Sequence, residues 1–173
     1  MVLHMKSSYN REIACSFSGY RPEKLPWGQN ENDERCLRLK EKLYDVIAAV
    51  YTSGIRHFIC GMALGSDMYF CEAVALFRED HGDITLEAAL PCEDQAAKWS
   101  ERQRNRYFKL IQQCDTETYV SRKYTPDCMM RRNKYMVDNS SVLIAVYDGR
   151  FGGTMQTVGY AEASGLEIIQ IKP

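Results

Sequence analysis

A glycine-rich stretch near the carboxyl end of the chain has the residue types of an anion-binding turn. An apolar segment, Val142 to Val146, leads into Asp148-Gly149-Arg150-Phe151-Gly152-Gly153-Thr154, and a helical pattern follows from Met155 to Ser164. A turn between a strand and the start of a helix presents unpaired backbone N–H groups, which bind phosphate. The adjacent glycines let a ligand approach the backbone closely, and Thr154 offers a hydroxyl to a phosphate oxygen or to the helix as its cap. Taken alone, the stretch is equally typical of a plain tight turn.

Two further turns combine glycine with a hydroxyl or a charge, and both also follow predicted strands. Ser18-Gly19-Tyr20-Arg21-Pro22 comes after an apolar segment at 13–18, and Gly61-Met62-Ala63-Leu64-Gly65-Ser66-Asp67 comes after a second one at 57–60. In an open α/β sheet, ligands bind outside the carboxyl ends of the strands. Each turn alone would be plain turn chemistry, but three of them at one edge favour an anion or nucleotide site.

The polar side chains on these turns predict individual roles. Arg21 would clamp a phosphate, its alternative being an ordinary solvated arginine. Asp67 and Asp148 would face sugar hydroxyls, the alternative for Asp67 being a helix cap. In the run Met130-Arg131-Arg132-Asn133-Lys134, Arg131 or Asn133 could face the same edge, although a solvated helix start fits the run better. The candidate ligand-binding residues are Ser18, Gly19, Arg21, Gly61, Gly65, Asp67, Asn133, Asp148, Gly152, Gly153 and Thr154.

These turns need a scaffold, and the hydrophobic pattern predicts one. Expected strands alternate with expected helices, and several strands are continuous apolar runs, as in strands buried on both faces. The pattern predicts an α/β fold, a single Rossmann-like domain over residues 1–173, with a mostly parallel sheet of about six strands and helices on both faces. The order of the strands does not follow from the sequence. The strands are expected at 13–18, 57–60, 85–90, 117–120, 142–147 and 167–171. The first two helices are expected to begin after a cap at Asn32 or Asp33 and after a cap at Ser66 or Asp67. The other three are expected over 95–113, with a break near Ser100, over 128–139 and over 155–164.

The composition excludes several classes of protein. The 173 residues are 45% hydrophobic and 26% charged, and the formal net charge of -1 creates no field that attracts nucleic acid or an anionic membrane. No apolar run approaches the roughly 20 residues that span a bilayer, and Met1–Lys6 lacks the apolar run of a secretory leader. Seven cysteines without a Cys-x-x-Cys pair, three of them (Cys15, Cys60 and Cys71) in apolar stretches, predict reduced thiols and a cytoplasmic location. The three scattered histidines predict no metal site.

Strict enzyme motifs are absent from the chain. It has no G-x-x-x-x-G-K-[ST] of P-loop enzymes, no G-x-G-x-x-G after the first strand for NAD, and no G-x-S-x-G. The basic residues Arg102, Arg104, Arg106 and Lys109 lie beside Glu101 and predict a solvated helix face.

Four segments match a set of family signatures in the right order. The turn 18–22 is similar to G-[HY]-[RK]-P, and the turn 61–67 to G-x-x-x-G-x-[DE]. Residues 131–148 resemble K-N-x-[FY]-[ML]-[IV]-D…YD, and Gly153-Thr154 with Tyr160-Ala161 resembles a G-T…A helix start. These are signatures of YpsA-like proteins, and the resemblance covers nearly the whole chain. It implies membership of the SLOG group of Rossmann-like domains, which hold nucleotides or nucleotide derivatives and include DprA and the LOG-type phosphoribohydrolases. YpsA-like members have been linked to cell division and stress in Gram-positive bacteria.

One departure from the LOG-type pattern bears on chemistry. Those enzymes carry P-G-G-x-G-T-x-x-E, whereas residues 150–154 lack the proline and the extra glycine, and Thr157 stands in place of the acid. A hydroxyl with an ordinary pKa cannot replace a carboxylate as acid–base catalyst at neutral pH. Hydrolysis or transfer at a nucleotide's N-glycosidic bond is therefore the second hypothesis, with Glu72 and Glu162 as its candidate catalytic residues.

The leading hypothesis is a cytosolic nucleotide-binding module that acts as a sensor or regulator. Its ligand would be a small phosphorylated nucleoside or an ADP-ribose-like molecule, and no other cofactor is expected. A single-stranded DNA-associated protein of DprA type ranks third, because the chain lacks flanking domains and a clear basic groove. The expected partner is thus a small phosphorylated nucleotide, with no membrane insertion and with nucleic acid disfavoured. Helix faces rich in Tyr and Met leave room for a homo-oligomer.

Overall fold

The computed structural model describes residues 7–173, and the predicted absence of a secretory leader rests on Met1–Lys6, which lie outside the described residues. The strands are β1 (Ala14–Gly19), β2 (His57–Cys60), β3 (Thr85–Leu90), β4 (Thr116–Tyr119), β5 (Val142–Val146) and β6 (Glu167–Ile171). The helices are α1 (Glu34–Thr52), α2 (Ser66–Arg78), α3 (Glu101–Ile111), α4 (Cys128–Asp138) and α5 (Gly153–Ala163), with short 3₁₀ turns at Arg11–Ile13 and Pro22–Lys24.

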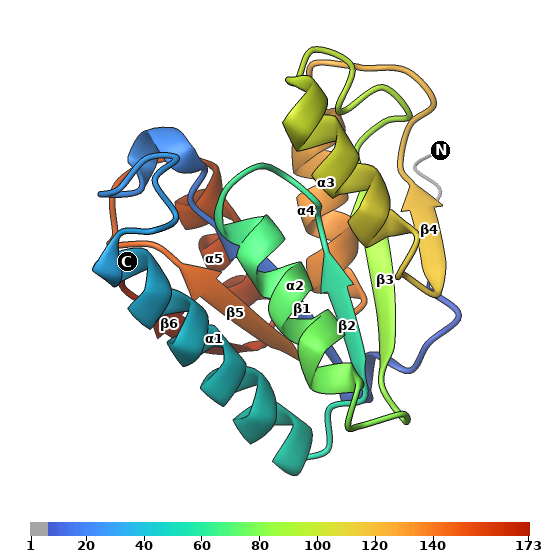
Figure 1. Cartoon of the computed structure of the whole chain (residues 1–173). Coiled ribbons are helices and arrows are strands. Elements are labelled where there is room, and N and C mark those ends of the chain that lie inside the picture. The colour runs from blue at the N-terminus through green and yellow to red at the C-terminus, as the bar shows by residue number, and fades with distance from the viewer. Residues whose placement is uncertain (1–6) are drawn as a thin grey trace.

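The six strands form one parallel sheet in the order β4-β3-β2-β1-β5-β6 (Figure 1). The chain builds outward from β1 to β4 and then returns to add β5 on the other side of β1. The predicted Rossmann-like parallel sheet is therefore confirmed, and the strand order places the reversal of direction between β1 and β5. In such sheets the crevice at this reversal, outside the carboxyl ends of the strands, is where ligands bind.

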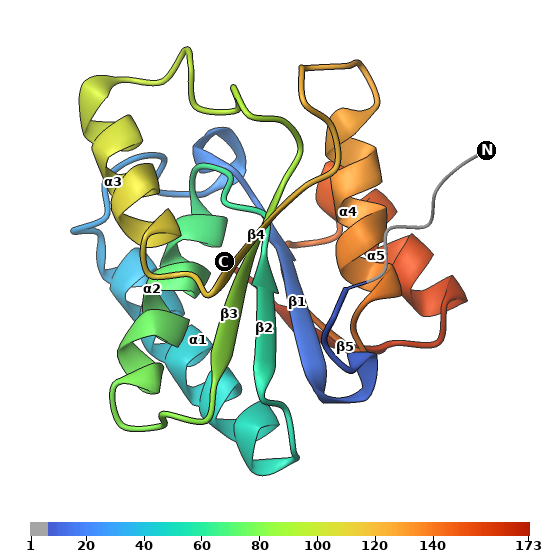
Figure 2. The same cartoon turned by 90° about the vertical axis from the view of Figure 1, so that its right-hand side faces the viewer.

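Helices cover both faces of the sheet, as predicted. Helices α1, α2 and α3 lie on one face and α4 and α5 on the other (Figure 2). The larger core lies under α1 and α2, where Phe17 of β1 stacks on Phe70 of α2 with ring centroids 4.5 Å apart. The apolar face predicted for α1 is buried in this core: Leu39, Leu43, Val46, Ile47 and Val50.

Two helix starts differ from the predictions because glycine caps them. The expected cap of α2 at Ser66 or Asp67 is wrong: Gly65 is the N-cap, and the Ser66 hydroxyl donates instead to the carbonyl oxygen of Tyr20 at 2.7 Å. Helix α5 begins at Gly153, with Gly152 as its N-cap, so Thr154 lies inside the first turn and does not cap it. In both helices the capping glycine has no side chain to occupy the space beyond the first N–H groups.

Two other helix starts follow ordinary capping rules. Asp33 caps α1 by accepting a hydrogen bond from the N–H of Arg35 at 2.9 Å, as predicted. Helix α3 begins at Glu101 and not at residue 95, because Ser100 and Gln103 form a capping box there. The predicted break near Ser100 is thus the true start of the helix.

The three cysteines in apolar stretches are free thiols, as predicted. Cys15, Cys60 and Cys71 are free and buried. Burial raises the pKa of the Cys60 thiol and keeps it protonated. No helix within residues 7–173 has both the length and the apolar character needed to cross a membrane.

Candidate functional site

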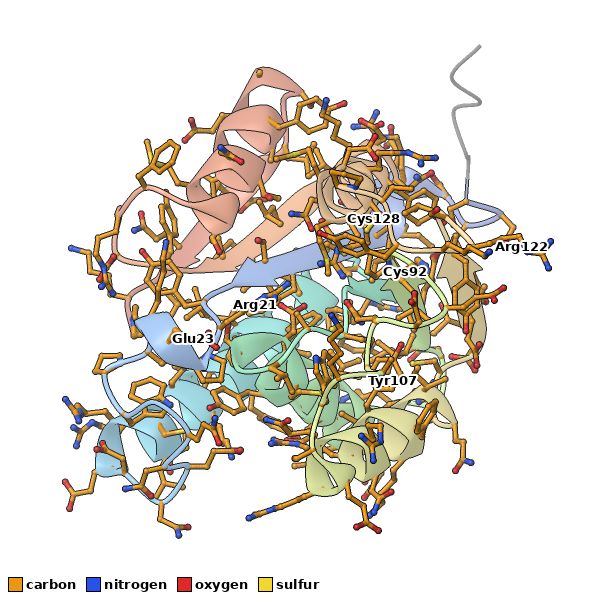
Figure 3. All side chains as sticks on the ribbon, turned by 90° about the horizontal axis from the view of Figure 1, so that it is seen from above. Arg21, Glu23, Cys92, Tyr107, Arg122 and Cys128 are labelled. Carbon is orange, nitrogen blue, oxygen red and sulfur yellow. The ribbon has the colours of Figure 1, made fainter. Side chains whose placement is uncertain are left out.

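A cleft of about 280 Å³ opens at the carboxyl ends of β1 and β5, where the strand order reverses. We call it the switch-point cleft, and Figure 3 looks down on this edge of the sheet, with Arg21 and Glu23 on the turn after β1. Four segments form its walls: the turn after β1, the loop before α2, one face of α4 and the start of α5. The lining residues are Phe17, Ser18, Gly19, Tyr20, Arg21, Glu23, Lys24, Ala63, Asp67, Met129, Arg132, Asn133, Met136, Gly153 and Thr154.

Two glycines let the turn after β1 pack directly against the start of α2. A Cβ on Gly65 would lie 2.8 Å from the carbonyl oxygen of Tyr20, and the residue has a φ of 89°, in the left-handed region. A Cβ on Gly19 would overlap the hydroxyl oxygen of Ser66. Because both Cβ atoms are missing, Ser66 can donate to Tyr20 and join the two turns into one wall of the cleft.

Arg132 of α4 lines the cleft, although the sequence assigned it no role in the site. Its side chain is only 4% exposed, so the solvated helix start expected for this run is wrong at Arg132. The guanidinium donates from Nη1 to the carbonyl oxygen of Gly61 and from Nε to Oδ1 of Asn133 at 2.8 Å, and Nη2 lies 3.7 Å from the sulfur of Met129. Burial lowers the pKa of Arg132, and the nearby Asp67 opposes that shift.

A sequence signal for the burial of Arg132 did exist. Tyr135 and Met136, three and four residues further along α4, are both buried. Residues at these spacings share one helix face, so an arginine at that position must point inward with them. Arg131, one residue earlier, points elsewhere and donates to the carbonyl oxygen of Val120 at 3.0 Å.

Asp67 places a buried carboxylate in the same cleft. It is 5% exposed, and its Oδ2 accepts a hydrogen bond from the backbone N–H of Ala63 at 3.0 Å. Burial raises the pKa of Asp67, and Arg132, the Ala63 N–H and Arg21 pull the value in the other direction. The cleft therefore holds an acceptor for hydroxyl donors beside its cationic groups.

The start of α5 supplies the backbone donors. No side chain caps this helix, and Thr154, at 8% exposed, lines the cleft beside Gly153. Thr157, where LOG-type enzymes carry an acid, donates its hydroxyl to the carbonyl oxygen of Gly153 at 2.9 Å, within the helix. Lys24 reaches across from the turn after β1 and donates from Nζ to the carbonyl oxygen of Phe151 at 2.7 Å.

A clasp behind the cleft connects the turns after β1 and β5. The Tyr20 hydroxyl donates to Asp148, and Arg150 pairs with the same carboxylate at 2.9 Å. Hydrogen bonds from Arg150 and then Tyr20 hold the pKa of Asp148 well below its usual range. Arg150 also donates to the carbonyl oxygen of Lys24 at 2.9 Å, so each turn positions the other.

The structure brings most of the sequence-predicted ligand residues to one place. Seven of them line the cleft: Ser18, Gly19, Arg21, Asp67, Asn133, Gly153 and Thr154. Gly61 lies behind Arg132, Gly65 behind the turn at Tyr20, and Gly152 beside Lys24, whose ammonium occupies the space that a Cβ on Gly152 would need. Asp148 belongs to the clasp.

The two candidate catalytic carboxylates lie elsewhere. Glu72 pairs with Arg106 of α3 at 2.6 Å and does not line the cleft. Glu162 is exposed near the carboxyl end of α5, the end opposite the cleft. The pairing of Arg106 with Glu72 and Glu31 also corrects the expectation of a wholly solvated basic face on α3.

Three comparisons identify the relatives of this chain. The family model YpsA, described as the YspA SLOG family, matches residues 15–167. The SPbeta prophage-derived protein YoqJ of Bacillus subtilis (strain 168) is 32% identical over 139 residues, which cover 73% of this chain and 81% of that protein. A UPF0398 protein of Bacillus pumilus (strain SAFR-032) is 26% identical over 140 residues, which cover 79% and 74% of the two chains.

A solved structure shares the fold. The X-ray structure of DNA processing protein A (DprA) from Streptococcus pneumoniae superposes with a TM-score of 0.61 at 12% sequence identity. The superposition covers 92% of this chain and 50% of DprA, so the chain spans about half the length of that structure. At 12% identity the similarity to DprA is a similarity of fold. The matches to the family model and to YoqJ are matches of sequence, and they show that the chain belongs to the YpsA family of SLOG proteins.

Proposed function

We propose that the switch-point cleft binds the phosphate of a nucleotide or nucleotide derivative such as AMP or ADP-ribose, and that the protein is a cytosolic sensor or regulator of that ligand. The observation that carries the proposal is Arg132. Its guanidinium is buried, and its hydrogen-bond partners are a carbonyl, an amide and a sulfur. A buried cation is costly unless anions compensate it. Asp67 is the nearby carboxylate that does so in part, and a phosphate oxygen would add a charge-assisted hydrogen bond.

The groups around Arg132 support an anion in the same place. Arg21 and Lys24 bring two more cations to the cleft, against the two carboxylates Glu23 and Asp67. The first turn of α5, which no side chain caps, directs backbone N–H groups and a partial positive charge toward the same space. Asp67 would then accept hydrogen bonds from the sugar hydroxyls next to the phosphate.

The test is calorimetric titration of AMP, ADP-ribose and NAD into the protein. Thr154→Val removes the hydroxyl that lines the cleft, and we expect it to weaken binding about tenfold, the loss of one hydrogen bond to a charged group. Thr157→Val is the matched control, because its hydroxyl bonds within α5 and does not line the cleft. Absence of heat with all three ligands, from a folded sample, would refute the proposal.

Single-stranded DNA is the second candidate ligand, because the chain shares its fold with a DNA processing protein. The formal net charge of -1 gives it no general attraction to nucleic acid. A gel shift with single strands at low salt separates the two ideas. Binding that falls steeply with added salt and is unaffected by AMP would favour DNA over a small nucleotide.

A further inference from the structure

A second hollow, larger than the switch-point cleft, lies between α2 and α3. Its volume is about 1010 Å³, and the loop 29–32 closes one side of it. Figures 1 and 3 show α3 next to α2, on the face that also carries α1. Helix α2 turns residues 68, 69, 72, 75 and 76 toward the hollow, the spacing of a single helix face, and its C-cap Glu79 extends that face. We call it the α2–α3 groove.

An ion network forms part of the lining of the groove. Arg106 donates to both oxygens of Glu31, at 2.6 and 3.0 Å, and to both oxygens of Glu72, at 2.6 and 2.8 Å. Lys40 adds a bond of 2.8 Å to Glu31 and lies over the ring of Tyr69. Within this network two cations thus satisfy two carboxylates, while Glu79, Arg102 and Lys109 are the charged lining residues outside it.

The walls of the groove are rich in side-chain amides. They carry Gln29, Asn30, Asn32, Gln103, Asn105 and Gln113. Two of these already have partners within α3 and its ends, since Gln103 accepts from the N–H of Ser100 in the capping box and Gln113 donates to the carbonyl oxygen of Lys109. A carboxamide both donates and accepts hydrogen bonds, so these residues suit hydroxyl groups and the edges of a nucleobase or an amide ring. The six amides outnumber the three charged lining residues outside the ion network, and they favour an uncharged polar ligand group.

Only a thin ridge separates the groove from the switch-point cleft. Arg21 and Ala63 line the cleft, whereas their chain neighbours Pro22 and Leu64 line the groove. Gly65 also lines the groove, and a Cβ on it would lie 2.9 Å from Cδ of Pro22 and 3.0 Å from Cα of Arg21. A ligand that leaves the cleft over Arg21 therefore enters the groove directly.

We propose that the α2–α3 groove is a second subsite, which binds the uncharged polar half of a dinucleotide-type ligand whose pyrophosphate lies in the switch-point cleft. This inference rests on the proposed function of the cleft. The cleft, at about 280 Å³, is just below the range of roughly 300–1,000 Å³ typical of ligand pockets, so it takes one nucleotide unit, and the groove takes the rest. The ligand class is a nucleoside joined through a pyrophosphate to a second ribose or ring.

The experiment compares AMP with NAD in calorimetric titrations. We expect NAD to bind the wild-type protein about tenfold more tightly than AMP does, because only NAD reaches both subsites. Ala75 lies on the groove face of α2, and Ala75→Trp would place an indole ring in the groove without touching the cleft. We expect this variant to bind AMP as the wild type does and to lose the advantage of NAD. Ala163→Trp, at the exposed end of α5, is the matched control and keeps that advantage.

A second variant tests the amides without blocking space. Asn105→Leu, on the groove face of α3, should weaken NAD and leave AMP unchanged. Retained AMP binding in each variant shows that the cleft is folded. If NAD binds no more tightly than AMP, or if Ala75→Trp leaves NAD binding intact, the second subsite is refuted while the cleft stands. If neither ligand binds the wild type, the proposed function fails and the subsite with it.

Discussion

The guanidinium of Arg132 donates a hydrogen bond to the carbonyl oxygen of Gly61, although 71 positions separate the two residues in the chain. A Cβ on Gly61 would lie 2.6 Å from Nη1 of Arg132. Because Gly61 has no side chain, the guanidinium of Arg132 can occupy the space beside it. This relationship joins α4 to the loop after β2 at the floor of the switch-point cleft.

Gly61→Ala should displace the Arg132 guanidinium. The overlap is with the far end of the Arg132 side chain, which is buried and must shift, so we expect the free energy of unfolding to fall by about 1–3 kcal/mol and phosphate ligands to bind more weakly. Chemical denaturation and calorimetry measure the two effects. Gly159→Ala is the control, because it lies within α5 with no neighbour in reach, and it should stabilise the protein by about 0.5–1 kcal/mol. Equal effects of the two substitutions would contradict this account.

Gly65→Ala should destabilise the protein more than Gly28→Ala does. Both residues have positive φ, 89° and 57°, so each substitution carries backbone strain of about 1–2 kcal/mol. Only at Gly65 would the new Cβ also meet backbone, the carbonyl oxygen of Tyr20 at 2.8 Å, whereas Gly28 has open space. Thermal unfolding of the two variants measures the difference. Identical melting temperatures would show that the turn after β1 can move away from α2.

The environment of Glu87 predicts that the free energy of unfolding depends on pH in the acid range. Burial raises its pKa, but bonds from His57 at 2.7 Å, from Tyr135 and from Thr118 at 2.8 Å outweigh burial, so the folded-state pKa lies below the ordinary value of 4.5. A carboxyl with a lowered folded-state pKa stabilises the fold above the unfolded-state pKa and loses that contribution as the pH falls through the folded-state value. The free energy of unfolding should therefore decline as the pH falls below about 4.5.

Glu87→Gln should lower the stability at pH 7 and flatten this decline. We expect a loss of about 1–3 kcal/mol at neutral pH, because the charged acceptor of the network is gone. Urea denaturation from pH 3 to pH 7 measures both quantities. The exposed Glu162→Gln serves as the control and should follow the wild-type curve. A Glu87→Gln curve parallel to that of the wild type would show that the lowered pKa is not what links stability to pH.

Lys24→Met should weaken phosphate ligands with little change in stability. The Lys24 ammonium donates to Phe151 at the mouth of the cleft, so it can turn from that carbonyl oxygen to an anion. We expect ligand affinity to fall severalfold at low salt and the gap to the wild type to narrow in high salt, because the lost attraction is screened. Lys98→Met, an exposed lysine outside the cleft, is the control. A salt-independent loss would point to a packing effect.

The sequence alone determined the elements and the class of fold. Strands β2, β3 and β6 have the predicted bounds, because short apolar runs ended by glycine, proline or polar turns leave little choice of structure. The three turns that carry the candidate ligand residues were also visible, since glycine beside hydroxyl and charged residues is a local pattern. Local signals of this kind survive in any tertiary arrangement, which is why these predictions required no knowledge of the strand order.

Only the tertiary structure decided which of these residues share a site. The sheet order sets β5 beside β1, and that neighbour relationship brings Thr154 and Lys24 to one cleft. The tertiary structure also buries Arg132, one residue of the basic run on α4, because the inner face of that helix packs over β1. On the opposite face of the sheet, the packing of α3 against α2 places Glu72 in an ion pair with Arg106, away from the cleft. Burial and pairing depend on contacts between distant segments. The spacing along α4 puts Arg132 on the same helix face as Met136, but a single sequence does not show what packs against that face.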